Sequence, residues 1–237
     1  VWAEVDLGAI SANVAALRDL AGVDVCAVVK ADGYGHGAVP VARAALAGGA
    51  VLLAVALVAE GAVLRDAGID APILVLSQAS PEEVDDLVAR RLAATAFTAA
   101  GVDALAAAAA SAGRSDTDPV DVHLKIDTGM HRVGAAPSVA VELAEAIQRS
   151  PGLRLAAVFT HFAVADEPDD PYTAEQLDRY RSVLDALADA GIDVPLRHAA
   201  NTAGAIAHPA ARFDMVRIGI GIYGLAPSPQ TSGLVAL

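Results

Sequence analysis

Short runs of β-branched residues alternate along this chain with longer stretches that are rich in alanine and leucine and have a helical period. The candidate strands are residues 25–30, 51–56, 73–77, 93–97, 120–126, 155–161, 196–200 and 215–219. The candidate helices are residues 39–46, 59–67, 81–90, 102–112, 137–150 and 173–190. This alternation predicts a parallel sheet with helices on both faces. Eight units in 237 residues match the size of a closed (β/α)8 barrel of the TIM type, which is the α/β fold that we predict.

A doubly wound open sheet is the alternative arrangement for the same pattern. Such a sheet normally carries a glycine-rich phosphate-binding turn directly after its first strand. The boundaries of the helices are supported by glycines that follow helical stretches, at positions 22, 48, 49, 68, 113 and 191. A left-handed residue ends a helix at little cost at such positions, and glycine adopts that conformation readily.

The charge balance argues against two classes of partner. Asp and Glu number 29 against 16 Lys and Arg, which gives a formal charge of −13. Nucleic acids and anionic membranes select basic patches, so we predict neither as a partner. The single cysteine, Cys26, cannot form an internal disulfide or a cysteine zinc site. We predict no metal, no membrane span and no signal peptide, and we interpret the protein as cytoplasmic.

The two ends of the chain do not fit the barrel pattern. Residues 1–7 are predicted to form a strand and residues 8–20 a helix, both before the first barrel strand. Residues 226–233 (APSPQTSG) have the composition of a linker, and linkers usually connect domains. We therefore expect a strand segment at residues 1–10 that joins a second domain, a barrel at 11–226, and a linker toward that domain at 227–237.

Polar residues interrupt the apolar strands near the point where each strand ends. In barrels of this type, functional groups lie at the carboxyl ends of the strands and in the loops that follow. We therefore expect the side chains to converge on one mouth of the barrel. The candidates are Lys30, Lys125 with Asp127, Thr160 with His161, His198 with Asn201 and Thr202, and Arg217.

Lys30 is the candidate whose surroundings are most specific. It ends an apolar strand, and partial desolvation lowers the pKa of an amine and so favours its neutral, nucleophilic form. Such a lysine can form an imine with an aldehyde cofactor or act as a base. Gly33, Gly35 and Gly37 follow, and they allow the chain to turn sharply against a ligand. The alternative is a lysine that extends its amine to solvent before a tight turn.

Arg132 and His161 each allow a functional and a structural interpretation. A guanidinium in the barrel mouth suits a carboxylate or phenolate oxygen, because its fork is planar and always charged. The alternative is a structural Lys125–Asp127 pair with Arg132 on the surface. His161 lies at a predicted strand end, where a lone histidine is more often a buried, hydrogen-bonded group than a catalyst.

The loops after the seventh and eighth predicted strands are candidates for binding phosphate. Asn201 and Thr202 supply an amide and a hydroxyl at the start of a predicted short helix. Gly219 and Ile220 supply backbone amides after the last strand. These two loops form the frequent phosphate site of the TIM barrel, although glycines at such positions also serve backbone packing.

Taken together, these segments resemble the alanine racemase family, whose N-terminal domain is a pyridoxal-phosphate-binding (β/α)8 barrel. The resemblance covers residues 1 to about 227. It rests on five motifs in the family's order: VVKADGYGHG (28–37), HLKIDTGM (123–130), THF (160–162), HAAN (198–201) and MVR (215–217). Thr202 stands where the family usually has serine, and the hydroxyl is kept.

The resemblance implies pyridoxal 5'-phosphate as the cofactor. Lys30 would hold it as an imine and then serve as the base on one face of the substrate α-carbon. Tyr34, Thr202, Gly219 and Ile220 would hold its phosphate. Each of these assignments transfers a family role to the matching position of this sequence.

Further roles follow for the other matched positions. Arg217 would face the pyridine nitrogen, with His161 hydrogen-bonded behind it, and Asn201 would belong to the cofactor site. Arg132 would contact the phenolic oxygen and help to place the substrate carboxylate. Lys125 matches a position that is carbamylated in some members. Because an arginine cannot accept the pyridine proton and repels it, the ring nitrogen should stay neutral, which favours racemisation over transamination.

The function implied is alanine racemisation, an isomerase activity that supplies D-alanine for peptidoglycan, with alanine as the substrate. In the family, the base on the opposite face is a tyrosine from the second domain of the partner subunit, so a homodimer is expected and this chain alone should be inactive. The alternatives are a single-domain pyridoxal-phosphate homeostasis protein and a racemase for another small amino acid such as serine. An amino-acid decarboxylase is a further alternative, but the TGMHR segment (128–132) fits racemases better.

Overall fold

The computed structural model describes residue 2 and residues 4–232, in which eight strands alternate with helices. The strands are β1 (Asp24–Val28), β2 (Leu52–Val55), β3 (Ile73–Val75), β4 (Ala94–Ala96), β5 (Val120–Lys125), β6 (Leu153–Phe159), β7 (Arg197–His198) and β8 (Met215–Ile218). The helices are α1 (Leu7–Ala21), α2 (Lys30–Tyr34), α3 (Ala38–Ala47), α4 (Val58–Asp66), α5 (Val84–Ala89), α6 (Ala99–Ser111), α7 (Ala140–Arg149), α8 (Tyr172–Asp189) and α9 (Thr202–Ala207). Short 3-10 turns are η1 (Pro137–Val139), η2 (Pro209–Ala211), η3 (Ile220–Tyr223) and η4 (Pro229–Thr231).

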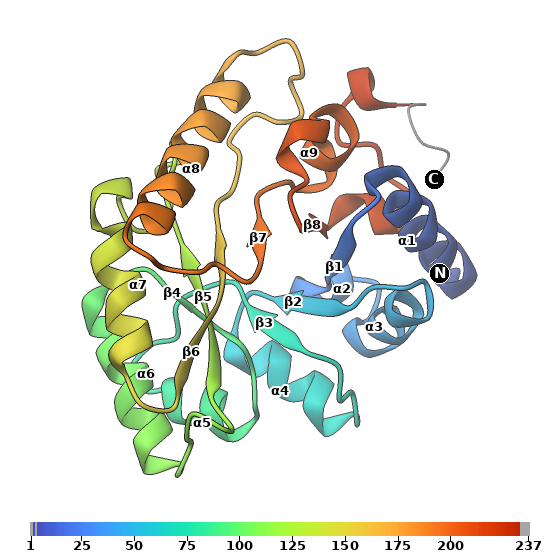
Figure 1. Ribbon diagram of the computed structural model, residues 1–237. Helices are drawn as coiled ribbons and strands as arrows, with labels where there is room; N and C mark the ends of the chain where they lie inside the picture. Colours follow the sequence, from blue (N-terminus) through green and yellow to red (C-terminus); the bar gives the residue numbers. More distant parts are fainter. Residues whose placement is uncertain (1, 3, 233–237) are drawn as a thin grey trace.

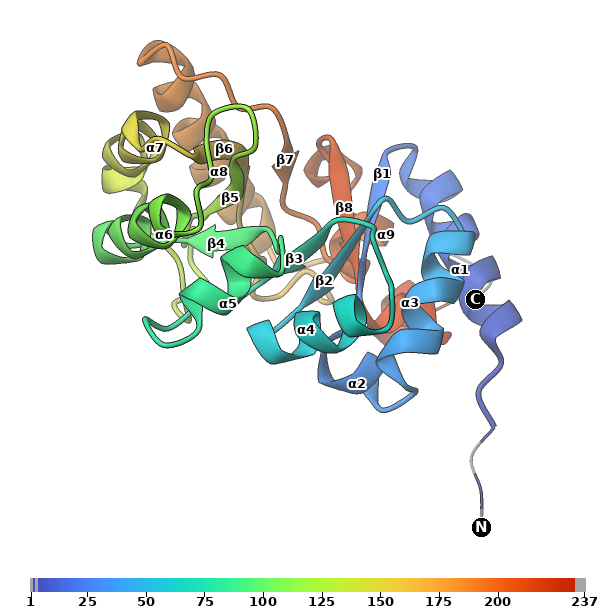
Figure 2. The ribbon, with the colours of Figure 1, turned by 90° about the horizontal axis from the view of Figure 1, so that it is seen from below.

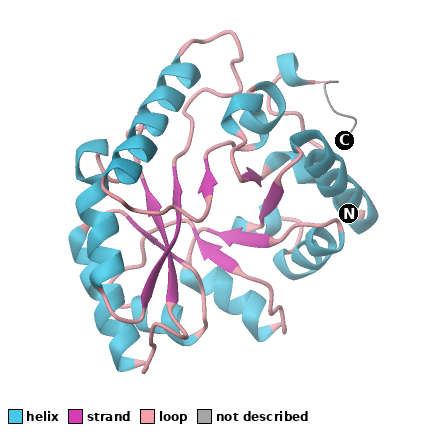
Figure 3. Cartoon of the chain, in the orientation of Figure 1, coloured by secondary structure: helices cyan, strands magenta, loops and turns pink. Residues whose placement is uncertain are grey.

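The eight strands form a ring, which confirms the predicted TIM-type barrel. They pair in parallel as two sheets of four, in the orders β3-β2-β1-β8 and β4-β5-β6-β7. Backbone hydrogen bonds join the two sheets at both seams: Val75 N–H donates to Ala93 O at 3.0 Å, and Arg217 N–H donates to Ala200 O at 2.9 Å. Helices surround the strands (Figures 1 and 3). A ring with two closed seams excludes the doubly wound open sheet.

The inside of the barrel is divided into an apolar half and a polar half. Successive residues of a strand point to opposite faces, so every second side chain points into the ring. On β1–β3 and β8 these side chains form a separate apolar cluster: Cys26, Val28, Leu52, Ala54, Leu74 and Met215. On β5, β7 and β8 the buried side chains are polar: His123, Lys125, His198 and Arg217. Burying such groups costs free energy unless they are hydrogen-bonded, so this half of the barrel is the first place to look for function.

The helices predicted from the sequence are confirmed as elements, but every strand differs from its predicted range at one or both ends, and three of these differences concern the site. β1 ends at Val28, so Lys30 lies two residues beyond the strand that it was predicted to end. β6 ends at Phe159, before His161, and β7 has two residues instead of five. Beyond these strand ends, single backbone hydrogen bonds still reach the neighbouring strands, from Val29 N–H to Ala54 O and from Thr160 N–H to His198 O.

The strand predicted for residues 1–7 is wrong within the described residues. Trp2 and residues 4–6 are in no strand, and Leu7 begins α1. A strand needs a neighbour to pair with, and the segment before α1 extends away from the barrel (Figure 2). Asp6 is instead the N-cap of this helix, because its side chain accepts the N–H of Ala9 at 3.0 Å. Val1 and Ala3 lie outside the described residues.

Among the helices of the described part of the chain, none is long and apolar enough to cross a membrane.

Candidate active site

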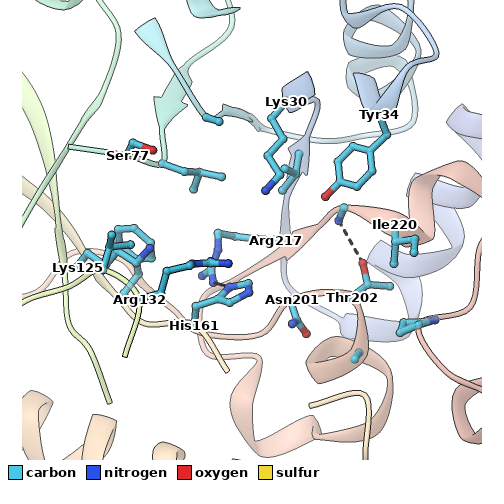
Figure 4. Close-up of a pocket in the computed structure, with 18 of the residues that line it drawn as sticks. Lys30, Tyr34, Ser77, Lys125, Arg132, His161, Asn201, Thr202, Arg217 and Ile220 are labelled. Atoms are coloured by element: carbon cyan, nitrogen blue, oxygen red, sulfur yellow. Dashed lines mark hydrogen bonds between the residues drawn. The ribbon is translucent and has the colours of Figure 1, made fainter. Parts of the chain in front are cut away.

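All ten residues that the sequence analysis placed in the site line one cavity of about 560 Å³ at the carboxyl ends of the strands (Figure 4). They are Lys30, Tyr34, Lys125, Arg132, His161, Asn201, Thr202, Arg217, Gly219 and Ile220. Three further candidates, Asp127, Thr160 and His198, are not among the described residues that line this cavity. The fold thus brings together side chains that are up to 190 positions apart (Lys30 to Ile220), whereas the role of each stays a prediction.

The cavity is strongly cationic although the chain as a whole is acidic. Lys30, Lys125, Arg132 and Arg217 line it, and Asp166 is the one carboxylate among the described residues that do so. Four positive charges against one negative charge, in a chain of formal charge −13, concentrate a positive potential at this mouth of the barrel. The site is therefore suited to an anionic ligand or to a pair of anions.

Lys30 stands at the start of a left-handed turn. Ala31, Asp32 and Gly33 have φ values of 53°, 52° and 61°, and Tyr34 follows at 53°. Three of these four residues are not glycine, and each such residue costs about 1–2 kcal/mol in the left-handed region. Strain of this kind persists only where surrounding contacts hold it, and it occurs preferentially at functional sites.

Tyr34 is fixed by its aromatic neighbour and lies directly over the backbone of Gly219. Its ring packs against that of Tyr223 with centroids 4.8 Å apart, and Tyr223 donates its hydroxyl to Val28 O at 3.1 Å. A Cβ atom on residue 219 would lie 2.7 Å from the Tyr34 hydroxyl oxygen, which is too close. Glycine is thus required here by close approach. Burial raises the pKa of Tyr34, so its hydroxyl keeps its proton and can donate it to a ligand.

The loops after β7 and β8 meet at Thr202. Its hydroxyl oxygen accepts the N–H groups of Gly219 at 3.1 Å and Gly221 at 3.3 Å. Asn201 precedes α9, and its Oδ1 accepts the N–H of Gly204 at 2.9 Å, so its carbonyl oxygen caps the helix. The Gly219 and Gly221 amides are thus engaged by Thr202, while the Thr202 and Tyr34 hydroxyls are hydrogen-bond donors of the kind that a phosphate needs.

Arg217 is a buried cation that is held by neutral acceptors. Its Nη1 donates to His198 Nδ1 at 2.9 Å, and its Nη2 donates to Thr160 O at 2.7 Å and Ala199 O at 3.0 Å. Nη2 also lies 3.1 Å from His161 Nδ1, as expected from the sequence. Burial lowers the pKa of Arg217 to about 10, which still leaves it charged at neutral pH.

Arg217 also sets the tautomers of the histidines behind it. Because Arg217 can only donate, His198 Nδ1 accepts and the ring proton of His198 is on Nε2. That proton is donated to His123 Nδ1 at 3.1 Å. Burial, followed by the charge of Arg217, lowers the pKa of His123 to about 3 and those of His198 and His161 well below the usual range. All three rings are therefore neutral at physiological pH.

The protein family described as alanine racemase, N-terminal domain, matches residues 5–227 of this sequence. This chain belongs to the alanine racemase family. The alanine racemase of Symbiobacterium thermophilum is 46% identical over 237 residues, which is 100% of this chain and 62% of that protein. The alanine racemase of Thermobifida fusca is 43% identical over 231 residues, which is 96% of this chain and 61% of that protein.

Solved structures of alanine racemases share the fold. The enzyme of Clostridium difficile 630, in complex with cycloserine, has a TM-score of 0.94 at 35% identity and covers 100% of this chain. The enzyme of Bacillus anthracis, with bound L-Ala-P, has a TM-score of 0.89 at 36% identity, again over 100% of this chain. This chain matches 65% and 61% of those two chains, so it spans less than two thirds of its relatives.

Within this alanine racemase family barrel, Lys125 is the amine that the surroundings perturb most clearly. Burial, followed by the charges of Arg217 and Arg132, lowers its pKa to about 8. Its Nζ lies 5.4 Å from the centre of the Phe159 ring. The sequence analysis considered a structural pair between Lys125 and Asp127, but the hydrogen bonds of the Asp127 carboxylate go elsewhere. Asp127 Oδ1 instead accepts the N–H groups of Gly129 and His131 at 2.9 and 3.0 Å, which shapes the loop before Arg132.

Sequence reasoning missed several residues of the alanine racemase family cavity. Ser77, Phe159 and Asp166 also line it. Ser77 and Phe159 lie within predicted strands and Asp166 lies in the loop after one, so their position at the carboxyl ends was an available signal. His123 was quoted only as part of a motif, and no local pattern indicated its contact with His198.

A second cavity of about 530 Å³ lies at the amino ends of β3–β6. Its arginines are Arg65, Arg90, Arg91, Arg114 and Arg154. They are already engaged: Arg65 donates to four backbone carbonyls, and the others pair with aspartates. This end of a TIM barrel usually contributes to stability, which agrees with that use of the arginines.

Proposed function

We propose that this chain forms the pyridoxal-phosphate-binding barrel of an alanine racemase, an enzyme that interconverts L- and D-alanine. The observation that carries the proposal is the single cavity in which Lys30, Arg132 and Arg217 meet beside the Thr202–Gly219 contact (Figure 4). Family membership supports the reaction type. The cations of the cavity supply what a phosphate and a substrate carboxylate require.

The residues present fit pyridoxal 5'-phosphate. The hydroxyls of Tyr34 and Thr202 both lie beside Gly219, between β1 and β8, where they can donate to a phosphate. Ile220 and Asn201 complete the lining at that end. When bound, the cofactor supplies an aromatic ring that withdraws electrons and so acidifies the α-carbon of an attached amino acid.

Each of the central side chains then has a defined task. Lys30 would hold the cofactor through its amine and, once that amine is free, would move a proton on one face of the α-carbon. Arg217 presents a donor that cannot accept a proton, so it would keep a ring nitrogen of the cofactor unprotonated. The cofactor would then withdraw electrons less strongly, which would favour return of the proton to the α-carbon over transamination. His161 holds the guanidinium of Arg217 from behind.

Arg132 is proposed to bind the substrate carboxylate and the phenolic oxygen of the cofactor. It lines the cavity, and its side chain belongs to the loop that Asp127 shapes. A small substrate such as alanine is expected from the family to which the chain belongs. Serine is the substrate from which alanine must be distinguished by experiment.

Inversion of a stereocentre needs a proton donor on the second face of the α-carbon. We propose that it comes from a second domain of a partner subunit, which makes the full enzyme a homodimer. The domain division at residues 1–10, 11–226 and 227–237 belongs to the same proposal, as do a cytoplasmic location and the supply of D-alanine to peptidoglycan. The relatives support it, because this chain spans 62% of the Symbiobacterium thermophilum enzyme.

The test is a racemisation assay with L-alanine and, in parallel, L-serine. Loaded with cofactor, this chain alone should show little conversion. A chimaera that continues into the second domain of the Symbiobacterium thermophilum enzyme should convert L- to D-alanine and prefer it to serine. Strong activity of the chain alone would contradict the second-domain base, and a cofactor-loaded chimaera that is inactive with alanine would contradict the proposed function.

Lys125 is expected to form a carbamate with carbon dioxide. Only the neutral amine reacts, and the pKa of about 8 means that the neutral fraction rises as the pH increases through 8. A carbamate would also place a negative charge among Arg132, Arg217 and Lys30. In ¹³C-bicarbonate, wild type should show a carbamate NMR signal that grows between about pH 7 and 9, within the range that a perturbed amine titrates. The Lys125→Met variant should lose the signal that belongs to Lys125 while keeping any carbamate signal of the α-amine and Lys30, and a spectrum identical to that of wild type would refute the assignment.

A further inference from the structure

Glu60 links the start of α4 to the turn that follows Lys30. Its Oε2 accepts the N–H groups of Ala56 at 2.6 Å and Leu57 at 3.1 Å, which are the ordinary contacts of a glutamate near a helix start. Its Oε1 is directed elsewhere and accepts the N–H of Ala31 at 2.6 Å, across 29 positions of the sequence. One half-buried carboxylate therefore serves two separate segments.

The Ala31 N–H needs an outside acceptor. The first N–H groups of any helical turn have no partner within the turn, and Ala31 begins the left-handed stretch. Because Ala31 is not glycine, its backbone does not adopt this conformation readily without such a contact. A charged acceptor makes the stronger kind of hydrogen bond.

Other contacts hold the far end of the turn. Asp32 Oδ1 accepts the N–H of Ala38 at 2.7 Å. His36 Nδ1 lies 3.0 Å from the carbonyl oxygens of Gly33 and Tyr34. The end next to Lys30 is the one that Glu60 holds.

We propose that Glu60 is a positioning residue that fixes the backbone at Lys30 and Ala31 and thereby keeps the Lys30 amine in the cavity. The inference rests on the proposed function for the role of Lys30, and it adds the group that orients this lysine. Glu60 itself does not line the cavity, as far as the described residues show, so it acts through the turn.

The next helix offers a matched control. Glu83 lies at the start of α5, where its Oε2 accepts the N–H of Ser80 at 3.4 Å. It has the same type of helix-start contact as Glu60 without the contact to the Lys30 turn. A loss that comes only from weakened helix capping should therefore appear in both glutamates.

The experiment compares Glu60→Gln with Glu83→Gln in the full chain. A glutamine has one oxygen, so it cannot accept at both segments, and its NH2 group would face an N–H. We expect hydrogen exchange of the Ala31 amide to accelerate about tenfold or more in Glu60→Gln, the scale of one lost charged hydrogen bond. Borohydride trapping of pyridoxal phosphate on Lys30 should slow by about tenfold for the same reason. Glu83→Gln should change neither rate.

A rescue separates positioning from helix capping. Adding Ala31→Gly to Glu60→Gln should restore about threefold or more of the lost trapping rate, because glycine enters the left-handed region freely. A helix-capping role predicts no such rescue. Unchanged Ala31 exchange in a folded Glu60→Gln variant, or equal effects in Glu83→Gln, would overturn the proposal.

Two further outcomes are also decisive. If Glu60→Gln fails to fold, Glu60→Asp replaces it: its shorter side chain cannot reach both segments, so exchange of the Ala31 amide should again accelerate by about tenfold. Unchanged exchange of the Ala31 amide in folded Glu60→Asp would overturn the proposal. If wild type traps no cofactor at all, the proposed function fails, whereas the exchange of the Ala31 amide still decides the role of Glu60.

Discussion

Lys30→Ala is expected to abolish covalent attachment of pyridoxal phosphate to this chain. The sequence contains two lysines, Lys30 and Lys125, so the attachment site can be assigned without ambiguity among side chains. The Lys30 amine points into the cavity from the turn after β1 (Figure 4). Removing it takes away the nucleophile that joins an aldehyde, which no rearrangement of the neighbouring arginines can replace.

The measurement is mass spectrometry after borohydride reduction, together with the visible absorbance of the bound cofactor. Wild type should gain the mass of a single cofactor and Lys30→Ala should gain none. Lys125→Ala is the matched control, and it should retain the adduct because Lys125 is proposed to carry a carbamate instead of binding the aldehyde. Loss of the adduct in Lys125→Ala with retention in Lys30→Ala would reverse the assignment.

Arg217→Ala should be among the most destabilising single substitutions in the barrel. It removes a buried guanidinium and leaves His198 Nδ1 and the carbonyl oxygens of Thr160 and Ala199 without their donor. It also opens a cavity next to Phe159, whose ring centre lies 5.2 Å from the guanidinium carbon. Each buried acceptor that is left without a donor costs about 1–3 kcal/mol.

Urea denaturation of Arg217→Ala and Arg197→Ala provides the comparison. Arg197 lies on the neighbouring strand β7 and pairs with Asp214 at 2.7 Å, with 45% of its side chain exposed. An exposed pair of this type is worth about 1 kcal/mol or less. Equal losses of unfolding free energy in the two variants would show that the buried acceptors around Arg217 find other donors. The hydrogen bonds of Arg217 would then not be what stabilises the polar half of the barrel.

The fold was predictable because its signal is local. A parallel strand that is buried on both faces is a short run of β-branched residues, and each surrounding helix repeats apolar residues with its own period. Both patterns can be recognised from residues that are close together in the sequence. The ring followed from the number of units and the chain length. The strand predicted for residues 1–7 does not form in the described residues, because no other described strand lies beside this segment to pair with it. Asp6 caps a helix there instead.

The site was predictable only in its membership. Burying a polar side chain costs free energy, so polar residues at the ends of buried strands are expected to face a site. On this ground Lys30, Arg132 and Arg217 could be predicted from the sequence, and the family motifs extended the set. The contacts among them could not. His123 and His198 are 75 positions apart and Arg217 and His161 are 56 apart, and their hydrogen bonds depend on which strands are neighbours in the ring.

The sequence by itself thus determined the barrel and the face on which chemistry is concentrated, because periodicity and residue type act over a few positions. The tertiary structure decided how the key groups are held. In the left-handed turn after Lys30, the Ala31 N–H donates to Glu60 from 29 positions away, and the neutral histidines behind Arg217 are fixed by a donor on another strand. Hydrogen bonds depend on distance and direction in space, and closing the ring is what brings these partners into range.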